Sequence, residues 1–434
     1  MKNRLKNYLK KDLVKVVGFT AIANFLKIFI NLISTKIVAV FIGPQGVALV
    51  GQFLNLFNIG SIFSSGGISN GVIKYISEYK EDNNQFKDYL GTALSITLFF
   101  SLFTSLILGL FSNYFCIKIF GSISYISILY VTAFTISLFA INSLLLSVIN
   151  GLKLFQKFIL INIISSLCSF IFTITLVYFY KVYGALLALA TYQSVVVLIT
   201  ILIIKKNNLF NFRDIKIKFD ISKGKQLLSY SMVAFVALLW PLINIIIRTQ
   251  IINSMSAYQA GVWEGMTKIS TLIVAVIGTS ISTYYLPRLS EITSEQTLRN
   301  EIYSGLKLFL SVTLLLVILL YVFRDFVISI LYTKDFSSMS GLFMFQLLGD
   351  FFWVAKMTLS VNMLARAMIK EYIVVEVIFA IIYLFCSLYL IHTGLGIVGV
   401  SISHMIYNLL YFITMIFVFR RLLFSSIQKS PKGI

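Results

Sequence analysis

Long apolar runs, each long enough to cross a lipid bilayer, follow one another along almost the whole chain of 434 residues. A helix that spans a bilayer needs about 20 predominantly apolar residues, and its backbone hydrogen bonds are satisfied within the segment. The composition agrees, because 59% of the residues are hydrophobic and only 12% are charged, about half the charged share of an average soluble chain. These features predict an all-α membrane protein and leave no room for a soluble domain of useful size.

The pattern of apolar runs predicts about twelve transmembrane helices joined by short connections. We expect the spans over residues 14–42, 47–76, 89–113, 124–149, 158–180, 183–204, 227–253, 260–287, 303–323, 340–365, 372–391 and 396–419. An even number of spans places both termini on the same side of the membrane.

The basic residues of the connections indicate which side that is. Alternate connections hold twenty-five Lys and Arg residues in total, whereas the remaining connections hold only Lys118, Lys181, Arg324 and Lys334. Connections rich in Lys and Arg stay in the cytoplasm, so we expect a bacterial inner-membrane protein with both termini cytoplasmic. The formal net charge of +20 is then mainly a topology signal, and no nucleic-acid partner is expected.

The longest polar stretch, residues 205–226, lies close to the middle of the chain and carries seven Lys and Arg residues. Three pairs of short sequence matches also relate the two halves, at offsets of 212 to 215 residues: Gly46-Val47 with Gly261-Val262, Ser77-Glu78 with Ser290-Glu291, and Gly184 with Gly396. We therefore predict two six-helix lobes, over residues 1–204 and 227–434, joined by a basic cytoplasmic linker and related by a pseudo-twofold axis.

Several basic residues lie deep inside the expected spans, where an ionisable group is costly and is a candidate for function. Lys27, Arg248, Lys268 and Lys356 form this set, and Asn31 lies one helical turn from Lys27. Their number exceeds that of the acids in the spans, so we predict a cationic, water-filled cavity for an anionic group such as a pyrophosphate. The alternative is a dry bundle in which these charges pair with one another.

Three further ionisable residues, Glu264, Asp350 and His404, are candidates for ion coupling or for charge pairing. Glu264 precedes Lys268 by four residues, a spacing that suits a scaffolding ion pair. His404 could titrate near neutral pH, but a lone histidine in a span is more often a packed, hydrogen-bonded residue.

Glycines interrupt the second expected span in the sequence SIFSSGGISNG, residues 61–71. Gly66, Gly67 and Gly71 weaken a helix and predict a hinge, although close packing of another helix on these small residues is an equal alternative.

The sequence predicts no metal site and no cofactor. The segment GLGIVG, residues 394–399, follows no strand, so nucleotide binding there is not expected.

Five segments resemble the polysaccharide flippases of the multidrug/oligosaccharidyl-lipid/polysaccharide exporter superfamily. They are FIGPQGVALVGQF (41–53), GGISNGVIKYISEY (66–79), GVWEGMTKIS (261–270), YYLPRLSEIT (284–293) and FQLLGDFFWVAKM (345–357). The likeness is greatest to the O-antigen flippases and to the lipid III flippases of enterobacterial common antigen.

The resemblance implies a transporter, not an enzyme, that moves an undecaprenyl-pyrophosphate-linked oligosaccharide from the cytoplasmic to the periplasmic leaflet by alternating access. It also implies that a polysaccharide polymerase and a chain-length regulator act in the same pathway. In such proteins, cationic residues of the inner helices face the sugar-phosphate head group, and Lys27, Arg248 and Lys268 occupy suitable positions. Two alternatives stay open: a multidrug or cation antiporter of the same fold, and a membrane-embedded polymerase or glycosyltransferase.

Overall fold

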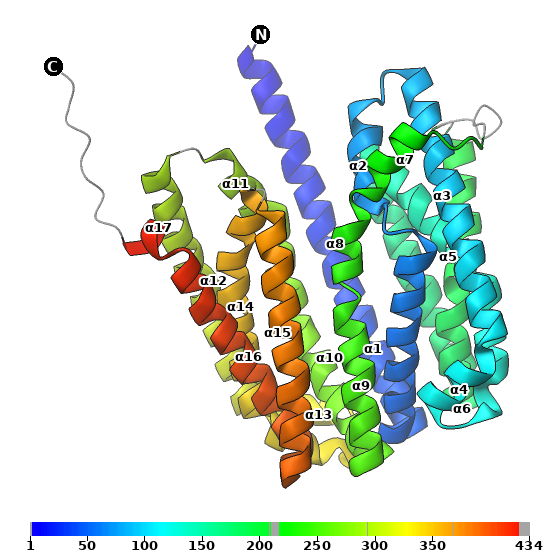
Figure 1. Ribbon diagram of the computed structural model, residues 1–434, viewed down its shortest axis with the longest axis vertical. Helices are drawn as coiled ribbons and strands as arrows, with labels where there is room; N and C mark the ends of the chain where they lie inside the picture. Colours follow the sequence, from blue (N-terminus) through cyan, green and yellow to red (C-terminus); the bar gives the residue numbers. More distant parts are fainter. Residues whose placement is uncertain (1, 208, 210–216, 293, 367, 425–434) are drawn as a thin grey trace. The chain divides into compact units, whose positions relative to one another are not determined.

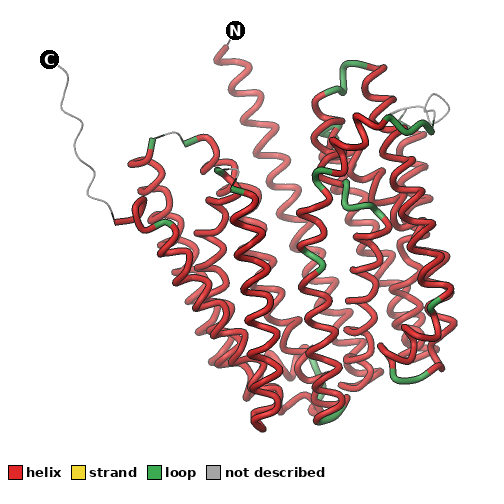
Figure 2. Tube along the Cα trace, viewed as in Figure 1, coloured by secondary structure: helices red, strands yellow, loops and turns green. Residues whose placement is uncertain are grey.

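The computed structural model describes residues 2–207, 209, 217–292, 294–366 and 368–424, with side chains from Leu26 onward except that of Thr283. All regular elements within these ranges are helical, and no strand occurs among them (Figure 2). The expected linker over 205–226 lies partly outside the described residues, as do Met1 and residues 425–434 at the two termini.

The chain divides by its contacts into two compact units, Met1–Ile245 and Ile246–Ile434. Figure 1 labels the helices in chain order. Unit 1 contains α1 (Lys2–Ser64), α2 (Ser69–Glu78), α3 (Asn83–Leu110), α4 (Ser112–Phe120), η1 (Ile123–Tyr125), α5 (Ile126–Gly151), α6 (Phe155–Lys206), α7 (Ile221–Leu228), α8 (Ser231–Val236) and the first part of α9 (Leu239–Ser254).

Unit 2 contains the rest of α9 and the remaining elements of the chain. These are α10 (Ala257–Ser280), η3 (Ile281–Tyr285), α11 (Leu286–Glu291), α12 (Glu295–Val322), α13 (Arg324–Leu331), η4 (Lys334–Leu342), α14 (Phe343–Ala365), α15 (Ile369–Leu390), η5 (Ile391–Leu395), α16 (Gly396–Val418) and α17 (Arg420–Phe424).

The described residues contain nine helical segments that are long and apolar enough to cross a membrane. Three of them, Leu26–Ser64, Phe155–Lys206 and Ile369–Val418, each cover two of the expected spans. The chain turns inside the first at Gly43 (φ 63°) before Pro44, and inside the second at Lys181 (φ 51°). Glycine adopts this left-handed conformation readily, and proline suits the start of the helix that follows. The nine segments therefore accommodate the twelve expected spans.

The glycine-rich segment of unit 1 is a genuine break between two helices. α1 ends at Ser64 and α2 begins at Ser69, and Gly66 and Gly67 both have left-handed φ angles of 64° and 66°. The same segment also receives a close neighbour, because a Cβ on Gly67 would lie 3.2 Å from the Cα of Ser231 in α8. The break and the close packing, which were alternatives from the sequence, thus occur together, and a hinge motion there stays a prediction.

The helix that was expected over 227–253 is divided among the end of α7, α8 and α9, and most of α7 lies in the expected linker. Its first part packs on unit 1: the Ser231 hydroxyl donates to the Gly66 carbonyl at 2.5 Å, and a Cβ on Gly71 would lie 3.2 Å from the Leu227 carbonyl oxygen. The division between the units consequently falls inside α9, later in the chain than the boundary that was expected after residue 226.

Unit 2 has an irregularity at the position that corresponds to the glycine break of unit 1. Residues Ile281–Tyr285 form a π-helical turn between α10 and α11, and α11 ends at Glu291 just as α2 ends at Glu78. A π-turn inserts one residue into a helix and is often found at functional sites. The internal repeat therefore includes an interrupted helix in each unit.

Candidate functional site

Unit 2 brings Arg248 of α9 and Glu264 of α10 into a buried ion pair. The Arg248 side chain is 2% exposed, and its Nη2 donates to the Glu264 carboxylate. The guanidinium also lies 5.4 Å from the centre of the buried Trp263 ring. A planar guanidinium suits such combined pairing and stacking. The sequence analysis assigned Arg248 to a surplus of positive charge, whereas in the structure Glu264 neutralises it.

Lys268 follows Glu264 by one helical turn of α10 and lies within electrostatic reach of both Glu264 and Arg248. It is partly buried, and no acid lies within ion-pair distance of its ammonium among the residues that the structure describes. The three residues together carry one net positive charge inside a membrane-spanning unit. An unbalanced charge at this depth is costly unless water or an anionic ligand reaches it.

A second polar group of unit 2 is centred on Asp350 of α14, which is fully buried. Its Oδ1 accepts hydrogen bonds from the Ser270 hydroxyl of α10 at 2.5 Å and lies 3.1 Å from His404 Nε2 of α16. The Gln346 amide donates to Ser270, and the Asn408 amide donates to the His404 carbonyl. The other carboxylate oxygen, Oδ2, has no hydrogen-bond partner among the described residues. This geometry can hold a proton between the carboxylate and the imidazole.

The contact between α14 and α16 depends on Gly349. A Cβ at this position would lie 2.2 Å from Cδ2 of His404, far closer than two carbon atoms can approach. The absence of a side chain at Gly349 lets the imidazole lie against the backbone of α14, beside Asp350.

Lys356 belongs to a third group, formed with α15 and α16. Its ammonium lies 4.2 Å from the centre of the Tyr411 ring and 4.7 Å from that of Tyr407. The Tyr411 hydroxyl donates to Glu376 at 3.2 Å, and Glu376 attracts Lys356 electrostatically. Lys356 is 3% exposed, so the structure surrounds it with aromatic rings and an acid.

Lys27 and Asn31 lie in α1 of unit 1, and both are exposed. They lie one helical turn apart, as the sequence spacing requires.

Unit 2 contains three separate charged groups. They are Arg248 with Glu264 and Lys268, Asp350 with His404, and Lys356. The sequence analysis placed Arg248, Lys268 and Lys356 in one cationic set, and the structure puts Lys356 in an environment separate from that of Arg248 and Lys268.

In unit 1, Lys74 of α2 was not assigned to a site by the sequence analysis, but it lies among aromatic rings. Its ammonium lies 4.9 Å from the Tyr75 ring and 5.7 Å from the Tyr230 ring. The Tyr230 hydroxyl lies within hydrogen-bonding reach of the Lys74 ammonium. These tyrosines are far apart in the sequence, so no spacing rule could have joined them.

Other residues of the site were missed for a similar reason. Ser270 and Tyr407 have uncharged side chains of kinds that are common in membrane helices, and they contact Asp350 and Lys356 across helices. Asn408 follows His404 by one turn of α16 and donates to its carbonyl. Gly349 precedes Asp350 directly in the sequence, and this adjacency is the one signal that could have indicated a close approach at the acid.

Two sequence comparisons extend over most of the chain. The profile of a family described as polysaccharide biosynthesis protein matches residues 37–341. The lipid III flippase of Escherichia coli (strain K12) is 28% identical over 373 residues, which cover 84% of this chain and 88% of the relative. The lipid III flippase of Shigella flexneri gives the same figures.

Solved structures with the same fold include two kinds of transporter. An inward-facing multidrug resistance MATE family transporter of the MOP superfamily gives a TM-score of 0.76 at 16% identity, over 91% of this chain and 94% of that chain. The lipid II flippase MurJ, in an inward closed conformation, gives a TM-score of 0.75 at 17% identity, over 93% of this chain and 87% of that chain. These matches confirm the predicted all-α membrane fold of two lobes.

Proposed function

The chain belongs to the family of polysaccharide biosynthesis proteins, and from this premise we propose that it is a flippase for a lipid-linked oligosaccharide. The substrate is an undecaprenyl-pyrophosphate-linked repeat unit, such as that of an O-antigen, which moves from the cytoplasmic to the periplasmic leaflet of the inner membrane by alternating access. A polysaccharide polymerase and a chain-length regulator would then use the exported unit.

The observation that carries the proposal is the group of Arg248, Glu264 and Lys268. Two cations and one acid lie together inside a membrane-spanning unit, so one positive charge is left for an anionic ligand. A pyrophosphate has the oxygens to accept charge-assisted hydrogen bonds from Lys268. In this proposal Glu264 holds the Arg248 guanidinium in place, and Lys268 makes the direct contact. Lys27 and Asn31 are proposed head-group ligands on unit 1.

Asp350 and His404 are the proposed coupling residues. The carboxylate and the imidazole lie in direct contact, so a proton can pass directly between them. Glu264 is less suited to this role, since its carboxylate already pairs with Arg248. Lys356 stays a proposed substrate ligand, although Tyr407, Tyr411 and Glu376 already surround its ammonium.

A deletion strain tests the function through its lipid-linked glycans. Loss of a flippase leaves single repeat units on the cytoplasmic leaflet, where they are inaccessible to periplasmic enzymes. Without a polymerase, single repeat units would still reach the periplasmic leaflet, and without a glycosyltransferase no complete units would form. Loss of a drug antiporter would change drug susceptibility and leave glycan export intact. Complementation by the native chain and by Lys268→Gln then assigns the defect: the native chain should restore export, and Lys268→Gln should not.

A further inference from the structure

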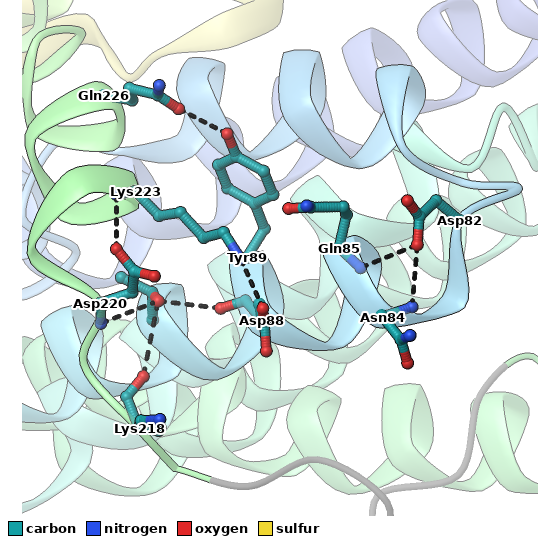
Figure 3. Close-up of polar contacts among 10 residues, drawn as sticks. Asp82, Asn84, Gln85, Asp88, Tyr89, Lys218, Asp220, Lys223 and Gln226 are labelled. Atoms are coloured by element: carbon teal, nitrogen blue, oxygen red, sulfur yellow. Dashed lines mark hydrogen bonds and ion pairs between the residues drawn. The ribbon is translucent and has the colours of Figure 1, made fainter.

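The helix α7 is fixed to unit 1 along one side, as Figure 3 shows. Lys223 Nζ lies 2.5 Å from the Asp88 carboxylate of α3, and the Tyr89 hydroxyl donates to the Gln226 side chain. Leu227 is fully buried in the core of unit 1. Lys223, Gln226 and Leu227 thus hold one side of α7 against unit 1, where α7 contacts α2 and α3.

The backbone that leads into α7 is fixed as well. The Thr92 hydroxyl lies 3.4 Å from both the Lys218 carbonyl oxygen and the Asp220 backbone nitrogen (Figure 3). The Asp220 carboxylate caps the helix by accepting the Lys223 backbone N–H at 3.1 Å, which lowers the pKa of Asp220. Residues Ile217 to Asp220 therefore have a defined backbone position. Lys218 contributes its carbonyl oxygen to it, and its side chain acts on Asp220 only electrostatically.

The opposite side of this segment combines large apolar side chains with lysines. Ile217 is 65% exposed, Phe219 51% and Ile221 67%, and Lys218 and Lys225 are exposed among them. A helical stretch that is long and apolar enough to cross a membrane begins at Ile221, so these residues lie at one end of it. Apolar side chains left in water there are unfavourable, whereas the boundary between head groups and acyl chains accepts both kinds of residue.

From this arrangement we infer that residues 217–225, the anchor segment, bind anionic phospholipid head groups at the membrane surface. Ile217, Phe219 and Ile221 enter the boundary with the acyl chains, and Lys218 and Lys225 pair with the phosphates. Charge complementarity identifies the ligand as an anion. The segment has two exposed lysines and one acid, Asp220, whose carboxylate caps α7. The inference is independent of what the protein transports.

A fluorophore placed on the anchor segment tests the inference in the full-length protein. Ser222 is exposed on α7, so Ser222→Cys carries an environment-sensitive nitrobenzoxadiazole probe, and protein without this substitution gives the background from the three native cysteines. Emission is measured in nanodiscs of phosphatidylcholine with increasing phosphatidylglycerol. We expect a blue shift that saturates as the fraction of phosphatidylglycerol rises.

Lys218→Gln/Lys225→Gln should lower the affinity of the anchor segment for phosphatidylglycerol about thirty-fold, since each lysine near an anionic surface contributes about five-fold. The blue shift of this variant should then no longer saturate. The matched control, Lys118→Gln/Lys334→Gln, removes two exposed lysines from connections expected on the other side and should respond like the native chain. Ile217→Ser/Ile221→Ser should reduce the shift in both lipids. The inference is overturned if the native probe ignores phosphatidylglycerol, or if both double lysine variants respond alike. It is equally overturned if a soluble protein, rather than lipid, is needed for the shift.

Discussion

Replacing Glu264 by glutamine removes the acid from the buried pair with Arg248 while conserving the shape of the side chain. The Arg248 side chain is 2% exposed and that of Glu264 10%, so little water can reach the charge that is left behind. Removing one partner of a buried ion pair costs about 3–5 kcal/mol. We expect the free energy of unfolding of Glu264→Gln to fall by this amount, measured by reversible unfolding in mixed micelles containing SDS.

Two further variants separate the pair from a general effect of mutation. Arg248→Met/Glu264→Gln removes both charges and should unfold within about 1 kcal/mol of the native chain, because a neutral replacement of a buried pair is often tolerated. Glu301→Gln disrupts the contact with Arg288, where the two charged groups are 3.7 Å apart and the Arg288 side chain is 47% exposed. It should change stability by less than about 1 kcal/mol.

The reasoning is refuted if Glu264→Gln unfolds like the native chain, or if the double variant is as unstable as the single one. The first result would mean that water or another group already compensates Arg248. The second would mean that the cost comes from lost packing and not from an unpaired charge. The double variant also separates stability from transport. It should insert and fold, so that any loss of glycan export in a deletion strain is due to the missing pair and not to misfolding.

Three other predictions follow from single positions. Gly349→Ala places a Cβ against His404 and should cost about 1–3 kcal/mol by overpacking, whereas Gly109→Ala, which has nothing within 4 Å, should cost far less in the same unfolding assay. At Gly67 an alanine would be strained by the left-handed φ and would also lie too close to Ser231, whereas at Gly43 only the φ is unfavourable. Gly67→Ala should therefore destabilise the protein more than Gly43→Ala, and equal effects would contradict close packing of α8. The lowered pKa of Asp220 means that its cap stabilises α7 above the ordinary carboxyl pKa of 3.8 and is lost as the pH falls through the lower folded value. Hydrogen exchange of α7 amides should therefore increase over that range, and Asp220→Asn should abolish the dependence.

The sequence predicted the class of the fold because lipid imposes strict rules on it. The length of the apolar runs fixed the spans, and the resemblance carried by segments such as 41–53 and 261–270 is confirmed by the family match and by the flippase relatives. The interruptions were harder to predict. The glycines at 66 and 67 indicated one of them, but no residue pattern distinguished the separate helices α7, α8 and α9.

The candidate site was predicted as a set of residues and not as an arrangement. The cost of charge in lipid selected Arg248, Glu264 and Lys268 one by one as candidates. The expected partner of Glu264 was Lys268, whereas the structure pairs it with Arg248. Asp350 and His404 are 54 residues apart in the chain and lie on different helices. Their contact depends on how α14 packs on α16. Helical spacing predicts which residues share a face of one helix. It cannot predict which residues of two different helices come into contact.

Binding of the substrate head group to purified protein tests the central claim most directly. Native mass spectrometry can compare retention of an undecaprenyl-pyrophosphate-linked oligosaccharide by the native chain, by Lys268→Arg and by Lys268→Gln. We predict that the native chain and Lys268→Arg retain the lipid, and that Lys268→Gln loses most of it while still folding. Equal retention by all three proteins would contradict the claim that the unbalanced charge beside Arg248 and Glu264 holds the pyrophosphate.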